Sequence, residues 1–283
     1  MITKLLRNMA KAAIDWLPHA VLYEAFYQSG RRLGVMSYEV KGVYGSIFGP
    51  LYDQTITKSY LRTGNWSPAI ANTLTQFFER SDGGTFYDIG ANIGLLTLAV
   101  SQNSKVQCVA FEPDPVNFRL LWVNVLTNRR DGTVKMINAA VFKESGEIKF
   151  TRDPYNSGDH RIAIDGDISV RTMRLDELTP PPRHPLAIKI DTQGAEPAIF
   201  EGGRETLAAA ELLICEFWPW GIRRAGLSVE PMLEVLPSMF PRAHILRREE
   251  RGPELSPQQL REEMAALAKD GSQYAAVDII LSR

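Results

Sequence analysis

Short apolar segments alternate with helical patterns along most of this chain, and that alternation constrains the fold most strongly. Apolar segments of strand length lie at residues 85–89, 106–111, 134–141, 186–190 and 212–217. Helical patterns follow at residues 95–100, 115–126 and 197–210, and a last helix and strand are predicted at 257–269 and 274–281. Nearly continuous apolar strands are typical of a parallel sheet with helices on both faces. The sequence therefore predicts an α/β fold with a doubly wound sheet.

The alternation begins late in the 283 residues and is interrupted once. We expect residues 1–80 to form an N-terminal cap of helices and short β segments, with helical breaks at Pro18 and around Gly30. Residues 81–283 are then one α/β domain. A polar stretch at about 146–175 is predicted to be an insertion with added strands.

Composition argues against several classes of protein. The chain has 32 basic and 33 acidic side chains, so its net charge of −1 attracts neither nucleic acid nor anionic lipid. Cys108 and Cys215 each lie in an apolar run, which favours buried thiols over a disulfide or metal site. No stretch reaches the roughly 18 apolar residues of a membrane span. The basic N-terminal segment lacks the apolar core of a secretory signal, so we expect a cytoplasmic protein without a transmembrane segment.

The segment at residues 86–97 combines a strand, a turn and a helix start. Gly90 permits a sharp turn off the strand, and Gly94 permits close packing of the following helix. Asp88 ends the strand, where it can bind a cationic group of a ligand, and Ala91 and Asn92 form the turn. A dinucleotide fingerprint would place a glycine where Asn92 stands, so the pattern disfavours NAD.

A second carboxylate follows the next predicted strand. Glu112 lies 24 residues after Asp88 (112 − 88) and precedes Pro113. A carboxylate at the end of the neighbouring strand can accept hydrogen bonds from ribose hydroxyls. The turn and Glu112 together predict a nucleoside site that suits S-adenosyl-L-methionine, whose ammonium group would lie near Asp88.

At this point the sequence resembles the FkbM family of methyltransferases. The blocks that carry the resemblance are residues 88–94, 111–113, 138–141, 175–178 and 188–196. The resemblance implies a Rossmann-like seven-stranded sheet, S-adenosyl-L-methionine as methyl donor and a hydroxyl oxygen as acceptor. It also extends the cofactor-binding set to Asn138, Ala139 and Asp191. The chain departs from the family at Gln193, where an acidic residue is common, and Glu196 is the neighbour that could carry such a charge.

Three residues are candidates for catalysis. Asp191 follows the strand at residues 186–190 and is predicted to face the donor or the acceptor, the alternative being a turn-capping aspartate. Lys189 shares a strand face with Asp191, so it is either a proton acceptor or a pairing partner of Asp191 or Glu216. His160, in the insertion, is the candidate general base by its intrinsic pKa, unless it is a solvated loop histidine.

Four further residues are candidates for binding the acceptor. Asn156 and Arg161 come from the insertion, and Glu216 and Trp218 come from the end of the strand at 212–217. Trp218 would stack against a sugar or another ring, and ordinary packing is the alternative. No set of metal ligands is predicted.

These observations predict an enzyme that O-methylates a hydroxyl on a small molecule or glycan. The alternatives are a nucleic-acid methyltransferase and a non-catalytic adenosylmethionine-binding module, with an NAD-dependent oxidoreductase disfavoured. The sequence does not identify the acceptor, and it leaves homo-oligomer formation open.

Overall fold

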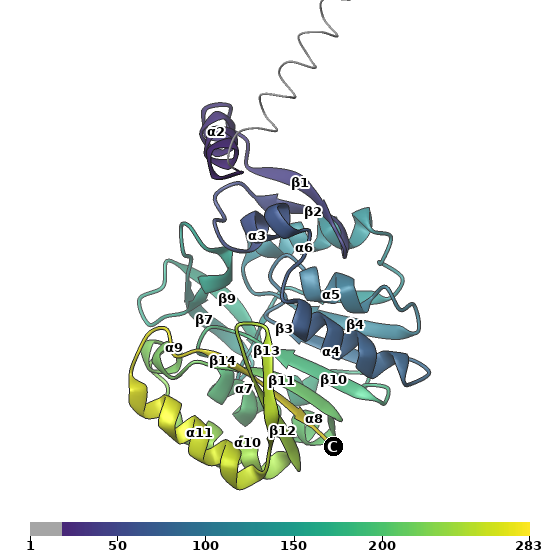
Figure 1. Ribbon diagram of the computed structural model, residues 1–283, viewed down its shortest axis with the longest axis vertical. Coiled ribbons are helices and arrows are strands. Elements are labelled where there is room, and N and C mark those ends of the chain that lie inside the picture. The colour runs from purple at the N-terminus through teal and green to yellow at the C-terminus, as the bar shows by residue number, and fades with distance from the viewer. Residues whose placement is uncertain (1–18) are drawn as a thin grey trace, which may run out of the picture.

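A central mixed β-sheet organises the computed structural model, which describes residues 19–283 (Figure 1). In this part of the chain the sheet has eight strands in the order β13-β12-β14-β11-β10-β3-β4-β5. Strands β5, β4, β3, β10 and β11 are parallel to one another, and β14, β12 and β13 each pair antiparallel with their neighbours. The strands are β3 (Gly84–Ile89), β4 (Val106–Phe111), β5 (Val134–Ile137), β10 (Leu186–Ile190), β11 (Leu212–Phe217), β12 (Arg242–Arg247), β13 (Glu250–Leu255) and β14 (Val277–Ser282).

The doubly wound α/β fold is confirmed, with two differences in the strands. The sheet has eight strands where seven were expected, because β12 continues through a hairpin into the edge strand β13. The segment predicted as one strand at 134–141 divides after Ile137. Its second part pairs with another sheet.

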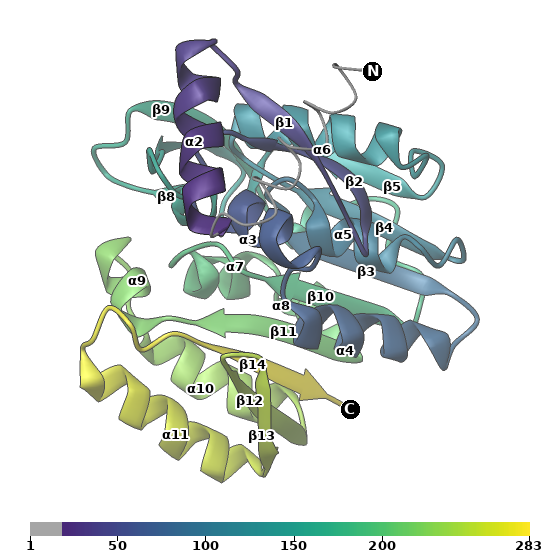
Figure 2. The same ribbon diagram turned by 45° about the horizontal axis from the view of Figure 1, so that its top comes forward.

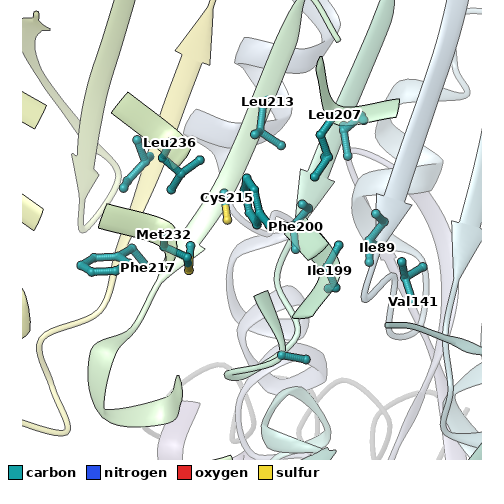
Figure 3. Packing of buried hydrophobic residues seen from close by; sticks show 14 of the residues in the cluster. Ile89, Val141, Ile199, Phe200, Leu207, Leu213, Cys215, Phe217, Met232 and Leu236 are labelled. Atoms are coloured by element: carbon teal, nitrogen blue, oxygen red, sulfur yellow. The ribbon is translucent and has the colours of Figure 1, made fainter. Parts of the chain in front are cut away.

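Helices cover both faces of the sheet, as Figures 1 and 2 show. One face carries α4 (Pro68–Glu79), α5 (Leu95–Val100) and α6 (Pro115–Thr127), and the other α7 (Glu196–Gly202), α8 (Arg204–Ala209), α10 (Glu230–Met239) and α11 (Pro257–Asp270). Figure 3 shows the second face, where Ile199, Phe200 and Met232 pack against Leu213 and Cys215 of β11. Side chains alternate between the faces along each strand, so one strand contributes to both cores.

The helix predicted at 197–210 is two helices, α7 and α8. They are separated at Gly203, whose backbone leaves the helical region at φ −133° and ψ 24°. A Cβ at Gly203 would lie 3.0 Å from the Cβ of Leu175, so the break is a point of close packing. The short helix α9 (Pro219–Arg224) and helix α10 follow β11, and neither was predicted.

The N-terminal region packs on the α6 side of the sheet. It contains α2 (His19–Arg32), β1 (Ser37–Gly42), β2 (Gly45–Pro50) and α3 (Ile56–Thr63). Helix α2 continues through Gly30, so the expected break is absent there, and Pro18 and the basic N-terminal segment lie outside the described residues. Asn124 of α6 and Asn128, the C-cap of that helix, form hydrogen bonds to β2 of the β1–β2 hairpin as a third strand would. Asn124 exchanges two hydrogen bonds with Phe48, and Asn128 exchanges two with Ser46.

Residues 140–173 form a second sheet in the order β6-β9-β7-β8. Its strands are β6 (Ala140–Val141), β7 (Gly146–Thr151), β8 (Arg161–Ile162) and β9 (Ile168–Met173), and a 3₁₀ turn spans Ser157–Asp159. Between β7 and β8 runs the segment 152–160, called the insertion loop below. Within residues 19–283, no helix is long and apolar enough to cross a membrane.

Candidate active site

A cavity of about 310 Å³ opens at the carboxyl ends of the parallel strands. It lies where the chain order reverses between β3 and β10, which is the usual ligand site of a doubly wound sheet. The cap contributes part of its wall through Ile56 and Trp66, and the insertion loop contributes Ser157 and His160. The cavity therefore joins three regions that are far apart in the sequence.

The turn after β3 has the backbone that the glycine spacing predicts. Gly90 has φ +81°, and a Cβ there would collide with the carbonyl oxygen of Asp191. Asn92 also adopts a left-handed conformation, at φ +53°. Gly94 has φ +92°, and a Cβ there would lie 2.5 Å from the Cδ1 of Leu121. The close contact at Gly94 is thus with helix α6 and not, as expected, between the following helix and the sheet.

Glu112 directly follows β4 and is 4% exposed. Its Oε2 accepts a hydrogen bond from the backbone N–H of Asn92 (2.8 Å), and its Oε1 accepts one from that of Asp114 (2.9 Å). Burial raises the pKa of Glu112 to about 8, although both N–H groups favour the ionised form. A carboxylate has about four lone-pair sites, so about two remain for hydroxyl donors.

The peptide after Glu112 is held by Asn138. Its Nδ2 donates to the carbonyl oxygens of Glu112 (2.8 Å) and Pro113 (3.0 Å). Asn138 therefore supports the cofactor edge through the backbone, while Pro113 and the buried Ala139 line the cavity itself.

Asp88, Lys189 and Asp191 form a charged group below the turn. Asp88 Oδ2 accepts a hydrogen bond from Thr97 Oγ1 (2.6 Å), whereas its buried Oδ1 accepts none and lies 3.7 Å from Lys189 Nζ. Lys189 Nζ donates to the carbonyl oxygen of Gly90 (3.1 Å) and lies 3.4 Å from Asp191 Oδ2. Burial lowers the pKa of Lys189, but Asp191 and Asp88 raise it by more, and the net shift is upward. Lys189 is therefore an ammonium group at neutral pH, so we assign it pairing rather than proton acceptance.

His160 lines the cavity but has both ring nitrogens engaged. Its Nε2 lies 3.3 Å from the carbonyl oxygen of Asp153, and its Nδ1 lies 3.4 Å from the Nδ2 of Asn117. A proton on Nε2 satisfies both contacts, because Nδ1 then accepts from the amide. Burial lowers the pKa of His160. The ring is thus neutral and buried, and its lone pair is already used within the fold.

The insertion loop is tied to the donor turn by backbone contacts. Asn92 Nδ2 donates to the carbonyl oxygen of Ser157 (2.7 Å), and the N–H of Ser157 lies 3.4 Å from Asp53 Oδ1 of the cap. Asn156 lines the cavity, and its Oδ1 accepts from the N–H of Gly158 (3.0 Å). Asn92 thus has a second role, as an anchor for the loop, that its place in a turn did not indicate.

Two predicted acceptor-binding residues lie outside the cavity wall. Arg161 donates to the carbonyl oxygen of Asp159, and Arg224 of α9 also pairs with Asp159, at 2.6 Å. Trp218 donates from Nε1 to the carbonyl oxygen of Gln273, and the Arg224 guanidinium lies 4.7 Å from its ring centre. The other two, Asn156 and Glu216, line the cavity. Arg161 and Trp218 belong to the contacts that join the insertion loop to α9.

The cavity wall opposite Glu112 is acidic. Gln193 Nε2 donates to Asp191 Oδ1 (2.8 Å) and Glu216 Oε2 (3.1 Å), so it bridges two carboxyl groups. Asp278 of β14 lines the same wall and was not predicted, although it is the only charged residue of an otherwise apolar strand, a signal visible in the sequence. Glu196 does not reach the cavity, because its Oε1 accepts from the N–H and hydroxyl of Thr192 (both 2.8 Å).

The arrangement at the turn fits S-adenosyl-L-methionine. The Oδ1 of Asp88, which accepts no hydrogen bond, is suited to an ammonium group, and the remaining lone pairs of Glu112 are suited to the two ribose hydroxyls. Among residues 19–283 there is no cluster of three or more His, Cys, Asp or Glu side chains that could hold a metal ion.

Comparison with known proteins agrees with this geometry. The model of the methyltransferase FkbM domain matches residues 88–238, more than half of the chain. A curated relative, the 2-O-methyltransferase NoeI of Sinorhizobium fredii, is 29% identical over 209 residues, which cover 64% of this chain and 84% of the relative.

Solved structures of methyltransferases also match, at lower similarity. An O-methyltransferase from Bacillus cereus in complex with SAH has a TM-score of 0.41 and 13% identity, covering 77% of this chain and 83% of that one. A precorrin-6y C5,15-methyltransferase from Geobacter metallireducens has a TM-score of 0.40 and 15% identity, covering 81% and 90%.

Proposed function

The chain belongs to the FkbM methyltransferase family and uses S-adenosyl-L-methionine as methyl donor, and we propose that it transfers the methyl group to a hydroxyl of a glycan or polyhydroxylated small molecule. The proposal is supported most by one observation, the carboxyl-lined wall that faces the donor turn across a single cavity. Hydroxyl groups donate hydrogen bonds to carboxylates, and a hydroxyl nucleophile must also lose its proton.

The relative NoeI supports the oxygen acceptor, since its name states 2-O-methylation. It does not identify the substrate of this chain. Trp218 and Trp220, whose ring centres are 5.3 Å apart, follow Glu216 closely in the sequence and suit the apolar face of a sugar beyond the cavity. We retain Trp218, Asn156 and Arg161 as proposed contacts for a longer acceptor.

The chain's own residues bind, orient and shield the reactants. When bound, the donor supplies an activated methyl group on positively charged sulfur. Glu112 and Asp88 hold its polar ends, and Asn92 fixes the turn and closes the insertion loop over it. Glu216 and Asp191 orient the acceptor hydroxyls. The apolar side chains of Ile56 and other residues in the cavity wall exclude water, which favours transfer between correctly placed partners.

The proposal is tested by incubating the protein with methyl-labelled S-adenosyl-L-methionine and separate pools of oligosaccharides, small polyols, amines and transfer RNA. We expect label in a hydroxyl-bearing pool, stable to mild base as an ether. Label confined to amines or RNA would overturn the hydroxyl assignment. A Glu112→Ala variant serves as the donor-site control, since its labelling should fall in every pool when the donor is subsaturating.

A further inference from the structure

We propose that Asp278 accepts the proton of the acceptor hydroxyl, with Glu216 as its partner across the β11–β14 strand pair. The inference rests on the proposed function, since the proton that it assigns is that of a hydroxyl acceptor. It adds a residue that lies 62 positions beyond Glu216 (278 − 216) and outside the matched family region of residues 88–238.

Strand register brings the two carboxyl groups together. Glu216 and Asp278 are direct partners in the antiparallel β11–β14 pair. Directly opposed side chains in such a pair have Cβ atoms about 5 Å apart. The neighbours Cys215 and Phe217 on β11, and Val277 and Ile279 on β14, all pack into the core on the α7 and α10 side. Glu216 and Asp278 therefore both point to the other face, where the cavity lies.

The same face carries the charged group at the donor end. Asp88 and Lys189 are direct partners in the parallel β3–β10 pair and line the same cavity. The buried Oδ1 of Asp88, on a side chain 1% exposed, accepts no hydrogen bond and thus marks a place for a ligand donor. Lys189 pairs in register with Ile214 of β11, so Glu216 lies two residues further along that strand, opposite Asp278. The charged side chains of β3, β10, β11 and β14 thus lie on one face but in two successive rows of the sheet.

The other candidate bases are already engaged. The free nitrogen of His160 accepts from Asn117, and Lys189 is held protonated between Asp88 and Asp191. Asp191 accepts from Gln193 and pairs with Lys189. By contrast, the Asp278 side chain accepts no hydrogen bond and has no ion pair within 4 Å from any described residue. Its lone pairs are available to a hydroxyl in the cavity.

The surroundings of Asp278 bring the pKa of its carboxyl group into the range that suits a general base. The charged groups that face it are Glu216, Asp191, Lys189 and Glu249, the last from the β12–β13 turn. Burial, followed by the charge of Asp191, raises the pKa of Asp278 to about 7, while Lys189 opposes the shift. Burial and Asp191 also raise the pKa of Glu216 well above its ordinary value. A base is most effective when its pKa lies near the working pH.

The proton balance of the reaction is complete with this assignment. An oxygen lone pair forms the new oxygen–carbon bond, the carbon–sulfur bond breaks with its electrons going to sulfur, and the hydroxyl proton passes to the carboxylate of Asp278. The products are a methyl ether, a neutral thioether and a carboxylic acid. The positive charge on sulfur disappears in the same step, so the acidic wall gains affinity for a proton when one is released.

A binding experiment tests the inference without any acceptor. Calorimetric titration of S-adenosyl-L-methionine at pH 7, in phosphate and in Tris, gives the number of protons exchanged on binding. A cation entering the cavity favours ionised carboxylates, so we expect the unmodified protein to release protons, up to about half a proton of which comes from Asp278, whose pKa is about 7. Asp278→Asn should lower the release by that contribution. Glu254→Gln, an exposed carboxylate on the same sheet, should not change it.

A kinetic experiment uses the hydroxyl acceptor found in the labelling screen. Asp278→Asn should lower kcat about 100-fold, the usual range for losing a general base, and abolish the acid limb of the pH profile. The melting temperature of this variant should stay within a few degrees of that of the unmodified protein, and its Kd for the donor within about three-fold. An unchanged proton release together with an unchanged pH profile would overturn the role of Asp278. Methylation of amines only would instead overturn the proposed function, and the inference with it.

Discussion

The two ends of the cavity differ in how completely their polar groups are satisfied. At the donor end Asp88 Oδ1 accepts no hydrogen bond, but both oxygens of Glu112 accept from backbone N–H groups, and the Asn92 side chain contacts both its own turn and the insertion loop. At the acceptor end, Glu216 accepts one hydrogen bond and Asp278 accepts none from the described residues. The donor end is therefore a prearranged binding surface, and we infer that the acceptor end is the reactive one. Groups that must change protonation during turnover cannot also be fully used by the fold.

The contrast has an origin in the chain. The donor end is built from one continuous strand, turn and helix, where backbone N–H groups converge on the following carboxylate. The acceptor end is assembled from three strand ends, β10, β11 and β14, whose side chains meet only through the sheet. Local backbone groups therefore satisfy the hydrogen bonds of Glu112 at the donor end, whereas the carboxyl groups at the acceptor end keep lone pairs that no neighbouring donor uses.

The largest effect should come from removing the cation between the two ends. Lys189→Met leaves the buried Asp88 and its neighbour Asp191 without their shared partner. Breaking a buried ion pair costs about 3 kcal/mol or more, so we expect a loss of about 3 kcal/mol in the free energy of unfolding by urea titration. Lys149→Met, an exposed lysine on β7, is the matched control. A loss below about 1 kcal/mol would contradict the role of Lys189 as the shared ion-pair partner of Asp88 and Asp191.

Substitution of Glu112 should weaken ligand binding at the donor end. Glu112→Ala removes two proposed hydrogen bonds to the ribose hydroxyls, each worth about 1 kcal/mol, so the Kd for S-adenosylhomocysteine should rise about 30-fold by calorimetry. Because the N–H groups of Asn92 and Asp114 lose their acceptor, Glu112→Gln is measured alongside to separate binding from loss of structure. The exposed Glu147→Ala serves as control. Unchanged affinity would contradict the ribose contact.

His160 tests whether the acceptor end contains a second base. Since both ring nitrogens are engaged, His160→Ala should lower the free energy of unfolding by about 1–2 kcal/mol, the net worth of its two hydrogen bonds. Turnover should fall more than donor binding as the loop loosens, but the pH dependence should remain. His184→Ala, at a half-exposed ring, controls for loss of a histidine. Loss of the acid limb with stability intact would make His160 the base instead.

The smallest effect concerns the pH dependence of stability. The pKa of Glu216 is raised in the folded protein, so the unfolded chain loses that proton at lower pH than the folded chain does. The folded state is therefore favoured below the unfolded pKa, near 4.3, and loses that advantage as pH rises towards the folded pKa. We expect Glu216→Gln to raise the melting temperature by about 2–4 °C at pH 8 and not at pH 4.5. An equal change at both pH values would contradict this origin.

The strands that could be predicted are those with continuous apolar runs. Residues 186–190 and 212–217 match β10 and β11 because central parallel strands are buried on both faces. The edge hairpin β12–β13 was missed, since its sequence from Arg247 to Glu254 is charged and contains Pro253, as edge strands often do. Helix α10 was missed because Pro237 interrupts its pattern.

The candidate site divides in the same way. The donor residues follow from the short spacing between Gly90, Gly94 and Glu112, which the backbone of one βαβ unit determines. The contacts of Asn92 with Ser157, and of His160 with Asn117, join segments about 40 to 65 residues apart and depend on tertiary packing. Asp278 is visible as a charge in an apolar strand, but only the β11–β14 register shows that it faces Glu216.

Asn124 and Asn128 have a consequence for how the chain can be divided. Their four hydrogen bonds to Phe48 and Ser46 bind the outer strand β2 to helix α6, inside the part of the chain that holds the donor turn. Asn124 also donates to the carbonyl oxygen of Ile93, one residue after Asn92. Expression from residue 81 onward would leave these amides facing solvent beside the turn. We therefore expect that removal of residues 19–80 would disturb the donor turn, because β2 and α6 support each other.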